Sequence, residues 1–249
     1  MAIKTLHYCW FGGNPLPEST KEYMKSWQKF CPDFELKRWD ETNFDINSVA
    51  FVKEAYEAKK YAFVSDYVRT YALYNEGGLY VDTDVEFVKP IDDLLNTSFM
   101  GFENPFIVAP GLILYANSPK LEIYGKILEY YDSLHYDDSV KSSISSPNIF
   151  TKILEEYGLI KTNTLQTVGG ITVYPTEYFQ PLGDRCYGIK KKITDNTRTI
   201  HHYDASWVDK REKSLYLLTK NHGKFWGKLL FIFKHPIYAF KYKRKSKKK

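Results

Sequence analysis

Two aspartates, Asp82 and Asp84, stand one residue apart at the end of a short apolar run that follows Gly77 and Gly78. Alternate residues of a strand share a face, so the sequence predicts that both carboxylates point the same way. Carboxylate oxygens are hard ligands that suit Mg²⁺ or Mn²⁺, and such an ion can also hold a diphosphate. The alternative is a solvated turn, because surface turns are rich in aspartate. The position directly after an apolar strand favours the metal site.

Asp66 and Arg69 form a second pair, three residues apart in a segment with helical periodicity that ends at Gly77. Residues with this spacing share one face of a helix. One interpretation is an exposed ion pair, which contributes little to stability. The other uses Asp66 as an acceptor for sugar hydroxyls and Arg69 as a planar donor to hydroxyls or phosphate. Spacing alone does not decide between them.

A third group lies near the far end of the chain, where His201 and His202 are followed by Ser206 and Trp207. A neutral imidazole can complete a coordination sphere that carboxylates begin. The serine hydroxyl and the indole N–H can donate hydrogen bonds to phosphate oxygens. Paired histidines in a loop fit ordinary surface polarity equally well, and the sequence does not choose between the two imidazoles.

Trp10 ends the first apolar run, directly before a turn that contains Gly12 and Gly13. A tryptophan in this place can belong to the core. It can also offer a flat face on which a nucleobase stacks.

Strands alternate with helices in the first part of the chain. Helices are predicted over residues 18–30, 49–60, 61–76, 119–134 and 148–157, and strands over 3–10, 34–39, 79–82, 85–88, 99–102, 107–115 and 171–174. Residues 178–204 are predicted to be rich in loops. The alternation predicts an α/β fold with a mostly parallel sheet, in which ligands bind beyond the carboxyl ends of the strands.

The composition of the 249 residues limits the possible classes of protein. A hydrophobic fraction of 43% and an aromatic fraction of 17% exclude a globally disordered chain. The three cysteines are an odd number without paired spacing, so neither a disulfide framework nor a zinc cluster is expected. The first residues lack the long apolar core of a signal peptide, which predicts a cytoplasmic protein.

Charge is unevenly distributed along the chain. Residues 220–249 carry 11 of the 35 Lys and Arg, and no acidic residue follows Glu212. The other residues therefore hold 24 bases against 30 acids, a net charge of −6.

We expect a catalytic domain over residues 1–212 and a basic, amphipathic tail over 213–249. The apolar run at 225–233 is too short to span a bilayer, so residues 220–249 are predicted to contact an anionic membrane surface. A disordered tail or one that touches nucleic acid is the alternative, and no nucleic acid partner is expected.

Four stretches together resemble glycosyltransferase family 32. They are residues 8–13 (YCWFGG), 65–69 (SDYVR), 77–84 (GGLYVDTD) and 202–207 (HYDASW). This family contains bacterial capsule and lipopolysaccharide sugar transferases and fungal mannosyltransferases. More distantly, the order of the motifs is similar to the catalytic domain of the large clostridial glucosylating toxins. The resemblance covers about residues 3–207, and the joined helix and aspartate motifs are its most specific part.

The resemblance implies a GT-A fold, a nucleotide-sugar donor, a Mn²⁺ or Mg²⁺ ion and retention of anomeric configuration. It implies that Trp10 stacks on the base and that Asp66 and Arg69 hold the donor sugar and the ribose. Asp82 and Asp84 would bind the metal and the diphosphate, with Asp84 the more direct ligand. Asp66, Arg69 and Asp84 are thus the expected catalytic residues. A uridine base is favoured, although stacking on Trp10 would also suit guanosine.

The same resemblance implies that His201 or His202 joins the metal and that Ser206 and Trp207 cover the diphosphate from a mobile loop. The expected reaction transfers a hexose to a saccharide acceptor, in particular a lipid-linked oligosaccharide of capsule or cell-surface polysaccharide synthesis. Such an enzyme would work at the inner face of the cell membrane.

The chain departs from the family pattern in two segments that would line the sugar and the acceptor. Residues 103–111 replace an Asn-x-x-x-Ala-type segment, and Ser146-Pro147 replaces a Gly-Pro that begins a later helix. These departures bear on specificity rather than on the chemistry. A front-face attack, in which a donor phosphate oxygen helps to deprotonate the acceptor, is the favoured mechanism because no carboxylate stands out as a covalent nucleophile.

Two other functions fit parts of the sequence. The Asp82–Asp84 string also fits the nucleophile turn of haloacid-dehalogenase-type phosphatases, with Asp137 and Asp138 as a candidate second acidic pair. Those enzymes usually place the turn on their first strand, whereas about eighty residues precede it here. A non-catalytic, membrane-tethered sugar-binding protein is the second alternative. The intact aspartates and Arg69 argue against it.

Overall fold

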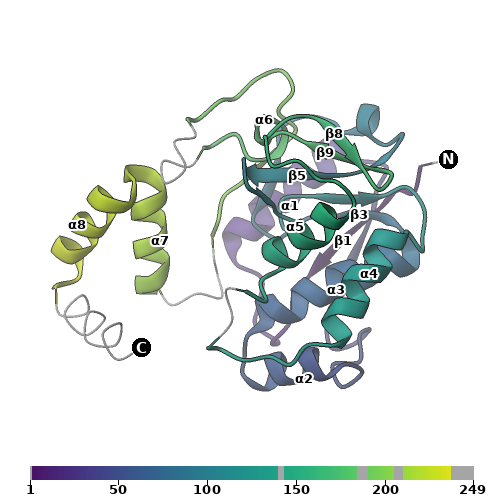
Figure 1. Ribbon diagram of the computed structural model, residues 1–249, viewed down its shortest axis with the longest axis horizontal. Helices are drawn as coiled ribbons and strands as arrows, with labels where there is room; N and C mark the ends of the chain where they lie inside the picture. The colour runs from purple at the N-terminus through teal and green to yellow at the C-terminus, as the bar shows by residue number, and fades with distance from the viewer. Residues whose placement is uncertain (1, 140–142, 184–189, 205–209, 237–249) are drawn as a thin grey trace. The chain divides into compact units, whose positions relative to one another are not determined.

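The computed structural model describes residues 2–139, 143–183, 190–204 and 210–236. The chain forms two compact units, one made of Met1–Pro181 with Ile193–Tyr203 and one made of Leu182–Lys192 with Asp204–Lys249. Figure 1 shows the first unit as a sheet flanked by helices and the second as a pair of helices. Each unit is described by itself.

The first unit is built on a mixed sheet with the order β2-β1-β3-β7-β5-β9-β8, to which β6 adds beside β5. Its strands are β1 (Thr5–Cys9), β2 (Glu35–Trp39), β3 (Gly78–Tyr80), β5 (Ser98–Asn104), β6 (Ile107–Val108), β7 (Leu114–Ala116), β8 (Gln166–Val168) and β9 (Ile171–Tyr174). The pairs β1–β2, β1–β3 and β5–β9 are parallel, whereas β7 runs antiparallel to both β3 and β5. Five strands therefore run in one direction, which confirms the predicted α/β fold with a mostly parallel sheet.

Helices cover both faces of this sheet (Figure 1). They are α1 (Glu18–Phe30), α2 (Ala50–Glu57), α3 (Tyr61–Glu76), α4 (Glu122–Asp132), α5 (Ser146–Glu156) and the short α6 (Thr176–Phe179), with a 3₁₀ turn at Asp92–Leu94. One hydrophobic cluster joins α2, α3, α4 and α5 to the sheet, and a second joins α1 and α6 to it. Leu79 belongs to the second cluster and Tyr80 to the first, as expected for neighbours on a strand.

The passage from α3 into β3 depends on two glycines with positive φ, Gly77 at 70° and Gly78 at 91°. Gly77 ends the helix, and its N–H donates to the carbonyl of Leu73 at 2.9 Å. A Cβ on Gly78 would lie 2.7 Å from the carbonyl oxygen of Thr5 on the neighbouring strand β1. Both positions therefore favour glycine, which lets β3 run directly beside β1.

A separate two-stranded sheet pairs β4 (Val85–Phe87) with β10 (Thr199–His201) in antiparallel register, with Val85 opposite His201. Residues 178–204 are rich in loops where the structure describes them, as predicted, but they also contain the end of α6 and the strand β10, which were not predicted. A three-residue strand has no local pattern of its own, and β10 forms because the edge of β4 offers it hydrogen-bond partners far away in the sequence.

The single strand predicted over residues 107–115 is also wrong. Two short strands, β6 and β7, occupy its ends, and a turn at 110–112 separates them. Pro110 lacks a backbone donor and Gly111 favours a turn, so the apolar run is interrupted at this point.

The second unit contains α7 (Lys210–His222) and α8 (Lys224–Lys234). Gly223 joins them with a φ of 79°. The helices pack closely, because a Cβ on Gly227 of α8 would lie 2.4 Å from the Cα of Thr219 in α7. Among the described residues, none of the helices combines the length and the apolar character that crossing a membrane requires.

Candidate metal and donor site

Asp82 and Asp84 lie in the turn that connects β3 with β4, and not on a strand. The N–H of Val85 donates to the carbonyl of Asp82 at 3.1 Å and closes this turn, while the N–H of Asp82 donates to Gly111 at 3.1 Å. The predicted reason for the alignment of the two carboxylates, alternation along a strand, is therefore wrong. A tight turn directly after a buried strand sets their positions.

The turn brings the two aspartates close to His201. One side-chain ligand atom from each of Asp82, Asp84 and His201 lies within 4.8 Å of the other two. Nε2 of His201 is 2.9 Å from Oδ1 of Asp84. The pairing of β10 with β4 causes this contact, since it sets His201 opposite Val85, the residue that follows Asp84.

These three residues fit a divalent cation. Two carboxylates and one imidazole form a donor set that suits Mn²⁺ and, through the oxygens, Mg²⁺. The buried Nδ1 atom of His201 has no hydrogen-bond partner among the described residues, whereas Nε2 lies against the Asp84 carboxylate. Burial lowers the pKa of His201, but the charges of Asp84, Asp82 and Glu103 outweigh burial and raise the pKa above its usual value. The buried imidazole of His201 therefore lies in a strongly negative electrostatic potential.

His202 points to a different partner. Its Nε2 atom lies 2.8 Å from Oε2 of Glu86, and its ring stacks on Tyr23 of α1 with 4.6 Å between the centroids. The backbone N–H of His202 donates to the carbonyl of Asp84 at 2.9 Å. Of the two histidines that the sequence left open, the structure thus brings His201 to the carboxylates and places His202 against β4 and α1.

Asp66 and Arg69 are both buried, with 9% and 4% of their surfaces exposed. The alternative of an exposed helical ion pair is therefore wrong. A guanidinium nitrogen of Arg69 lies 3.0 Å from Oδ1 of Asp66 and 3.1 Å from Oδ1 of Asp82. The guanidinium also lies over the ring of Tyr80, whose hydroxyl donates to Asp82 at 2.7 Å. Arg69 thus connects the helix motif with the aspartate turn.

Asp66 has a further partner in Ser146, the first residue of α5. The Ser146 hydroxyl donates to Oδ1 of Asp66 at 2.6 Å, and its N–H donates to Oδ2 at 3.4 Å. Burial raises the pKa of Asp66, while Arg69 and Ser146 act in the opposite direction. The sequence identified Ser146 as a departure on the sugar side but did not predict this contact.

Trp10 follows β1 directly and is half-buried. Its indole N–H donates to the carbonyl of Asn14 at 2.6 Å. Because β1 and β3 are parallel neighbours, Trp10 and the aspartate turn lie beyond the same edge of the sheet. The predicted donor residues Ser206 and Trp207 lie outside the described residues.

The roles of Gly111, Tyr203 and Glu103 in this site were not predicted, although residues 103–111 and 202–207 were recognised as segments of interest. A Cβ on Gly111 would lie 2.2 Å from Oδ2 of Asp82, so only a glycine leaves room for that carboxylate. Tyr203 packs its ring against His201 at a centroid distance of 4.0 Å, and its hydroxyl donates to Glu103 at 3.1 Å. The contacts of Gly111 with Asp82 and of Tyr203 with Glu103 link segments far apart in the sequence, which carries no local signal for them.

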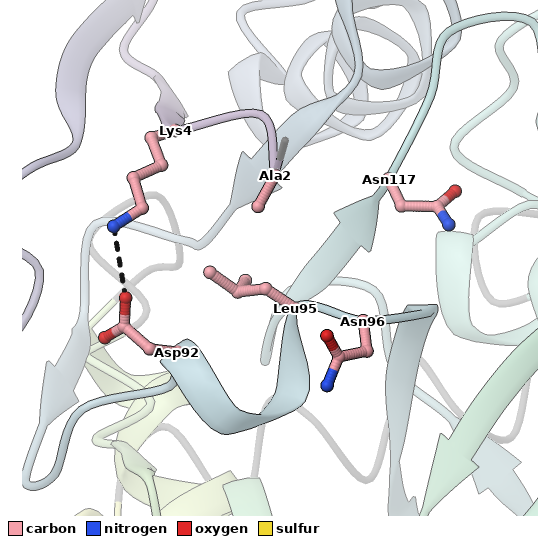
Figure 2. Close-up of a pocket in the computed structure, with 6 residues that line it drawn as sticks. All are labelled: Ala2, Lys4, Asp92, Leu95, Asn96 and Asn117. Carbon is pink, nitrogen blue, oxygen red and sulfur yellow. Dashed lines mark hydrogen bonds and ion pairs between the residues drawn. The ribbon is translucent and has the colours of Figure 1, made fainter.

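An open depression of about 500 Å³ lies elsewhere in the first unit. It is lined by Ala2, Lys4, Asp92, Leu95, Asn96 and Asn117 (Figure 2). Lys4 pairs there with Asp92 at 3.2 Å, and none of the lining residues belongs to the aspartate site. Lys4 precedes β1, whereas the aspartates follow β3, so the depression does not coincide with the carboxyl edge of the parallel strands.

Part of this chain is similar to a known protein family. Residues 17–100 match the family model described as the glycosyltransferase sugar-binding region containing a DXD motif. The match includes Asp66, Arg69, Asp82 and Asp84, and it confirms the predicted resemblance to DXD-containing sugar transferases. Over these residues the chain is similar to the sugar-binding region of DXD-containing glycosyltransferases.

Solved structures of two glycosyltransferases are similar to this chain. PaToxG glycosyltransferase is 17% identical, with a TM-score of 0.49 over 62% of this chain and 68% of that one. A glycosyltransferase involved in the glycosylation of the major capsid of PBCV-1 is 12% identical, with a TM-score of 0.46 over 84% of this chain and 96% of that one. No curated protein matches the sequence.

Proposed function

We propose that residues 1–212 form a retaining, metal-dependent glycosyltransferase of the GT-A class. It transfers a hexose from a nucleotide sugar, with a UDP-sugar favoured, to a saccharide acceptor. The observation that carries this proposal is the convergence of Asp82, Asp84 and His201 beside the buried Arg69. All but His201 lie in the part of the chain that matches the sugar-binding region of glycosyltransferases.

Asp82, Asp84 and His201 would hold Mn²⁺ or Mg²⁺. When bound, such an ion supplies positive charge to the diphosphate that leaves with the nucleoside. Arg69 has a distinct task in this arrangement, because its guanidinium contacts both Asp66 and Asp82. It holds the two carboxylates in fixed positions and adds a positive charge next to the place where negative charge develops.

Trp10 and Asp66 would bind the rest of the donor, with the base stacked on Trp10 and the sugar hydroxyls directed to Asp66. The sequence predicts that Ser206 and Trp207 would donate hydrogen bonds to the diphosphate. Exclusion of water from the site would limit hydrolysis of the donor.

The proposed reaction proceeds on one face of the sugar. A donor phosphate oxygen accepts the proton of the acceptor hydroxyl as the bond from the sugar to the diphosphate breaks. The contacts of Asp66 support this one-face mechanism, because its carboxylate accepts a hydrogen bond from Ser146 and forms an ion pair with Arg69. A carboxylate held in this way is a poor candidate for the nucleophile of a double displacement. Capture of a covalent glycosyl-enzyme adduct would contradict the front-face mechanism.

The proposed acceptor is a saccharide, in particular a lipid-linked oligosaccharide of bacterial capsule or cell-surface polysaccharide synthesis. The basic sequence after Glu212 supports an acceptor that resides at the inner face of a membrane. This placement makes the enzyme a cytoplasmic protein that binds the membrane peripherally.

A panel of nucleotide sugars tests the proposal, scanned by thermal shift and by slow donor hydrolysis with and without Mn²⁺. We expect one donor to raise the melting temperature only when the metal is present, and to be hydrolysed slowly. No response to any donor, together with hydrolysis of a generic aryl phosphate, would favour a phosphatase. The structure gives that alternative little support, since Asp137 accepts hydrogen bonds from Ser139 and Asp138 pairs with Lys60. Metal-dependent binding of a sugar donor without any turnover would favour the non-catalytic alternative.

A further inference from the structure

Helix α8 exposes a row of large apolar side chains. The exposed fractions are 73% for Phe225, 61% for Trp226, 40% for Leu230, 42% for Ile232 and 76% for Phe233. Successive residues of a helix are turned by about 100°, so these side chains fall within a continuous arc of roughly 160°. A helix in water normally turns such a face to a core, and exposed apolar patches of this kind mark contact sites.

The opposite side of α8 already has a partner. Gly227 and Phe231 are its buried residues, and they fall outside the exposed arc. Gly227 lies against Thr219 of α7. His235 directly follows α8, and its ring packs on Phe231 and lies within hydrogen-bond distance of Ser214 of α7. The helix therefore uses one side to pack on α7 and leaves its larger apolar side uncovered in this unit.

Lysines border the apolar arc. Lys224, Lys228 and Lys234 are all exposed and fall outside the arc by the same helical geometry. No acidic residue follows Glu212, and residues 220–249 hold 11 Lys and Arg. An apolar face that contains a tryptophan and is flanked by Lys228 and Lys234 complements a bilayer surface, where apolar side chains enter the acyl boundary and ammonium groups reach anionic headgroups.

We propose that α8 lies in the plane of an anionic bilayer, with Phe225, Trp226 and Phe233 inserted at the boundary between headgroups and acyl chains. Charge complementarity selects this occupant over a second copy of the chain, because two faces bordered by lysines would repel each other. The length of α8, 11 residues, fits an interfacial helix and not a membrane span. The proposal rests on the membrane placement in the proposed function and assigns it to one face of α8. It uses no residue of the aspartate site, so a failed vesicle test would leave the proposed sugar transfer standing.

Co-sedimentation of the full chain with vesicles tests the proposal. The vesicles contain phosphatidylcholine alone or phosphatidylcholine mixed with phosphatidylglycerol. We expect binding to the mixed vesicles, weakened roughly tenfold or more in the triple variant Phe225→Ser, Trp226→Ser and Phe233→Ser. The matched control, Ile160→Ser with Leu165→Ser, removes side chains of similar exposure from the first unit, 65% and 58%, and should bind as the wild type does.

A charge variant separates the two parts of the interaction. Lys224→Gln, Lys228→Gln and Lys234→Gln together should weaken the preference for phosphatidylglycerol and keep the apolar face intact, because eight of the 11 Lys and Arg of residues 220–249 remain. Circular dichroism and an unchanged melting temperature of the first unit verify that each variant folds, so that a loss of binding reports on the surface of α8.

Three results would overturn the proposal. The first is equal vesicle binding by the wild type and the triple apolar variant. The second is a dimer in light scattering that the triple variant loses, without any binding of vesicles by the wild type, which would make a second copy the occupant. The third is retention by single-stranded RNA in the absence of vesicle binding, which would make the basic segment a nucleic-acid surface.

Discussion

The guanidinium of Arg69 in α3 lies 3.1 Å from Oδ1 of Asp82 in the turn after β3. This contact joins two motifs that are separate in the sequence, and the same guanidinium also holds Asp66 at 3.0 Å. Asp82 is held further by the hydroxyl of Tyr80 at 2.7 Å. Since Arg69 is buried, its charge is compensated by these carboxylates, and the positions of the helix and the turn depend on each other.

Gly111→Ala should inactivate the enzyme while leaving the fold intact. The new Cβ would lie 2.2 Å from Oδ2 of Asp82, so that carboxylate must move away from its present position. We expect turnover of the nucleotide sugar to fall by about a hundredfold, because small displacements of a site residue cost this much. The control Gly125→Ala places its methyl group in α4, 3.2 Å from the ring of Tyr74, and should keep full activity. Similar activity in the two variants would contradict the role of Gly111.

The two adjacent histidines should differ in their effect on metal binding. His201→Ala removes the imidazole that lies 2.9 Å from Asp84, whereas His202→Ala removes one that pairs with Glu86. We expect the affinity for Mn²⁺, measured by isothermal titration calorimetry, to fall by at least about a hundredfold in the first variant. In the second it should fall by about tenfold or less, as for a residue that supports a ligand from outside the coordination sphere. A larger loss of Mn²⁺ affinity in His202→Ala than in His201→Ala would contradict this assignment and make His202 the metal ligand.

Ser146→Ala tests whether α5 positions Asp66. The change removes a hydroxyl that donates to Asp66 at 2.6 Å. Thr151→Ala is the matched control, because Thr151 is a buried hydroxyl on the same helix that accepts from the N–H of Val108 at 3.0 Å. Each variant should lose about 1–2 kcal/mol of unfolding free energy, as expected for one buried hydrogen bond. Only Ser146→Ala should also raise the KM for the donor, and an equal KM in both variants would count against the positioning role.

His7 should make the first unit less stable in mild acid. Its Nδ1 accepts from the indole N–H of Trp39 at 3.1 Å, so the neutral ring donates from Nε2 to the carbonyl of Gly77 at 2.9 Å. Burial lowers the pKa of His7 despite a raising effect of the Gly77 carbonyl. Below about pH 6.5 the unfolded chain binds a proton that the folded chain rejects, so stability falls with pH by up to about 1.4 kcal/mol per unit.

Chemical denaturation between pH 7.5 and 5 measures this slope. His7→Gln should be less stable than the wild type at neutral pH but should show a smaller loss on acidification. The exposed His222→Gln in α7 serves as the control and should keep the slope of the wild type. An unchanged slope in His7→Gln would rule out His7 as its source.

The sequence predicted those parts of this molecule that local patterns determine. The helix that ends at Gly77, the short strand after it and the aspartates at its end all follow from apolar periodicity and glycine positions. Burial of Asp66 and Arg69 did not follow, because a pair with helical spacing has the same pattern whether it faces water or the core.

The residues that complete the site come from segments distant in the sequence. Whether His201 or His202 faces the carboxylates depends on the register of β10 against β4, because β10 ends at His201, opposite Val85, and His202 follows the strand. Gly111 and Ser146 lie in segments that the family resemblance placed near the sugar, but their contacts with Asp82 and Asp66 arise from long-range packing of a turn and a helix start. Pairing and packing at long range, rather than propensity, therefore decide the composition of the site.

The central claim is that Asp82, Asp84 and His201 hold a divalent ion with which a nucleotide sugar binds. The most direct measurement is calorimetric titration of the donor identified by the panel into wild-type protein and Asp84→Asn, each with and without Mn²⁺. Asn keeps the shape of the side chain but removes its charge. The account predicts that the wild type binds the donor only with Mn²⁺ and that Asp84→Asn loses this dependence together with most of its affinity. Equal donor binding by both proteins, or wild-type binding that is independent of Mn²⁺, would contradict it.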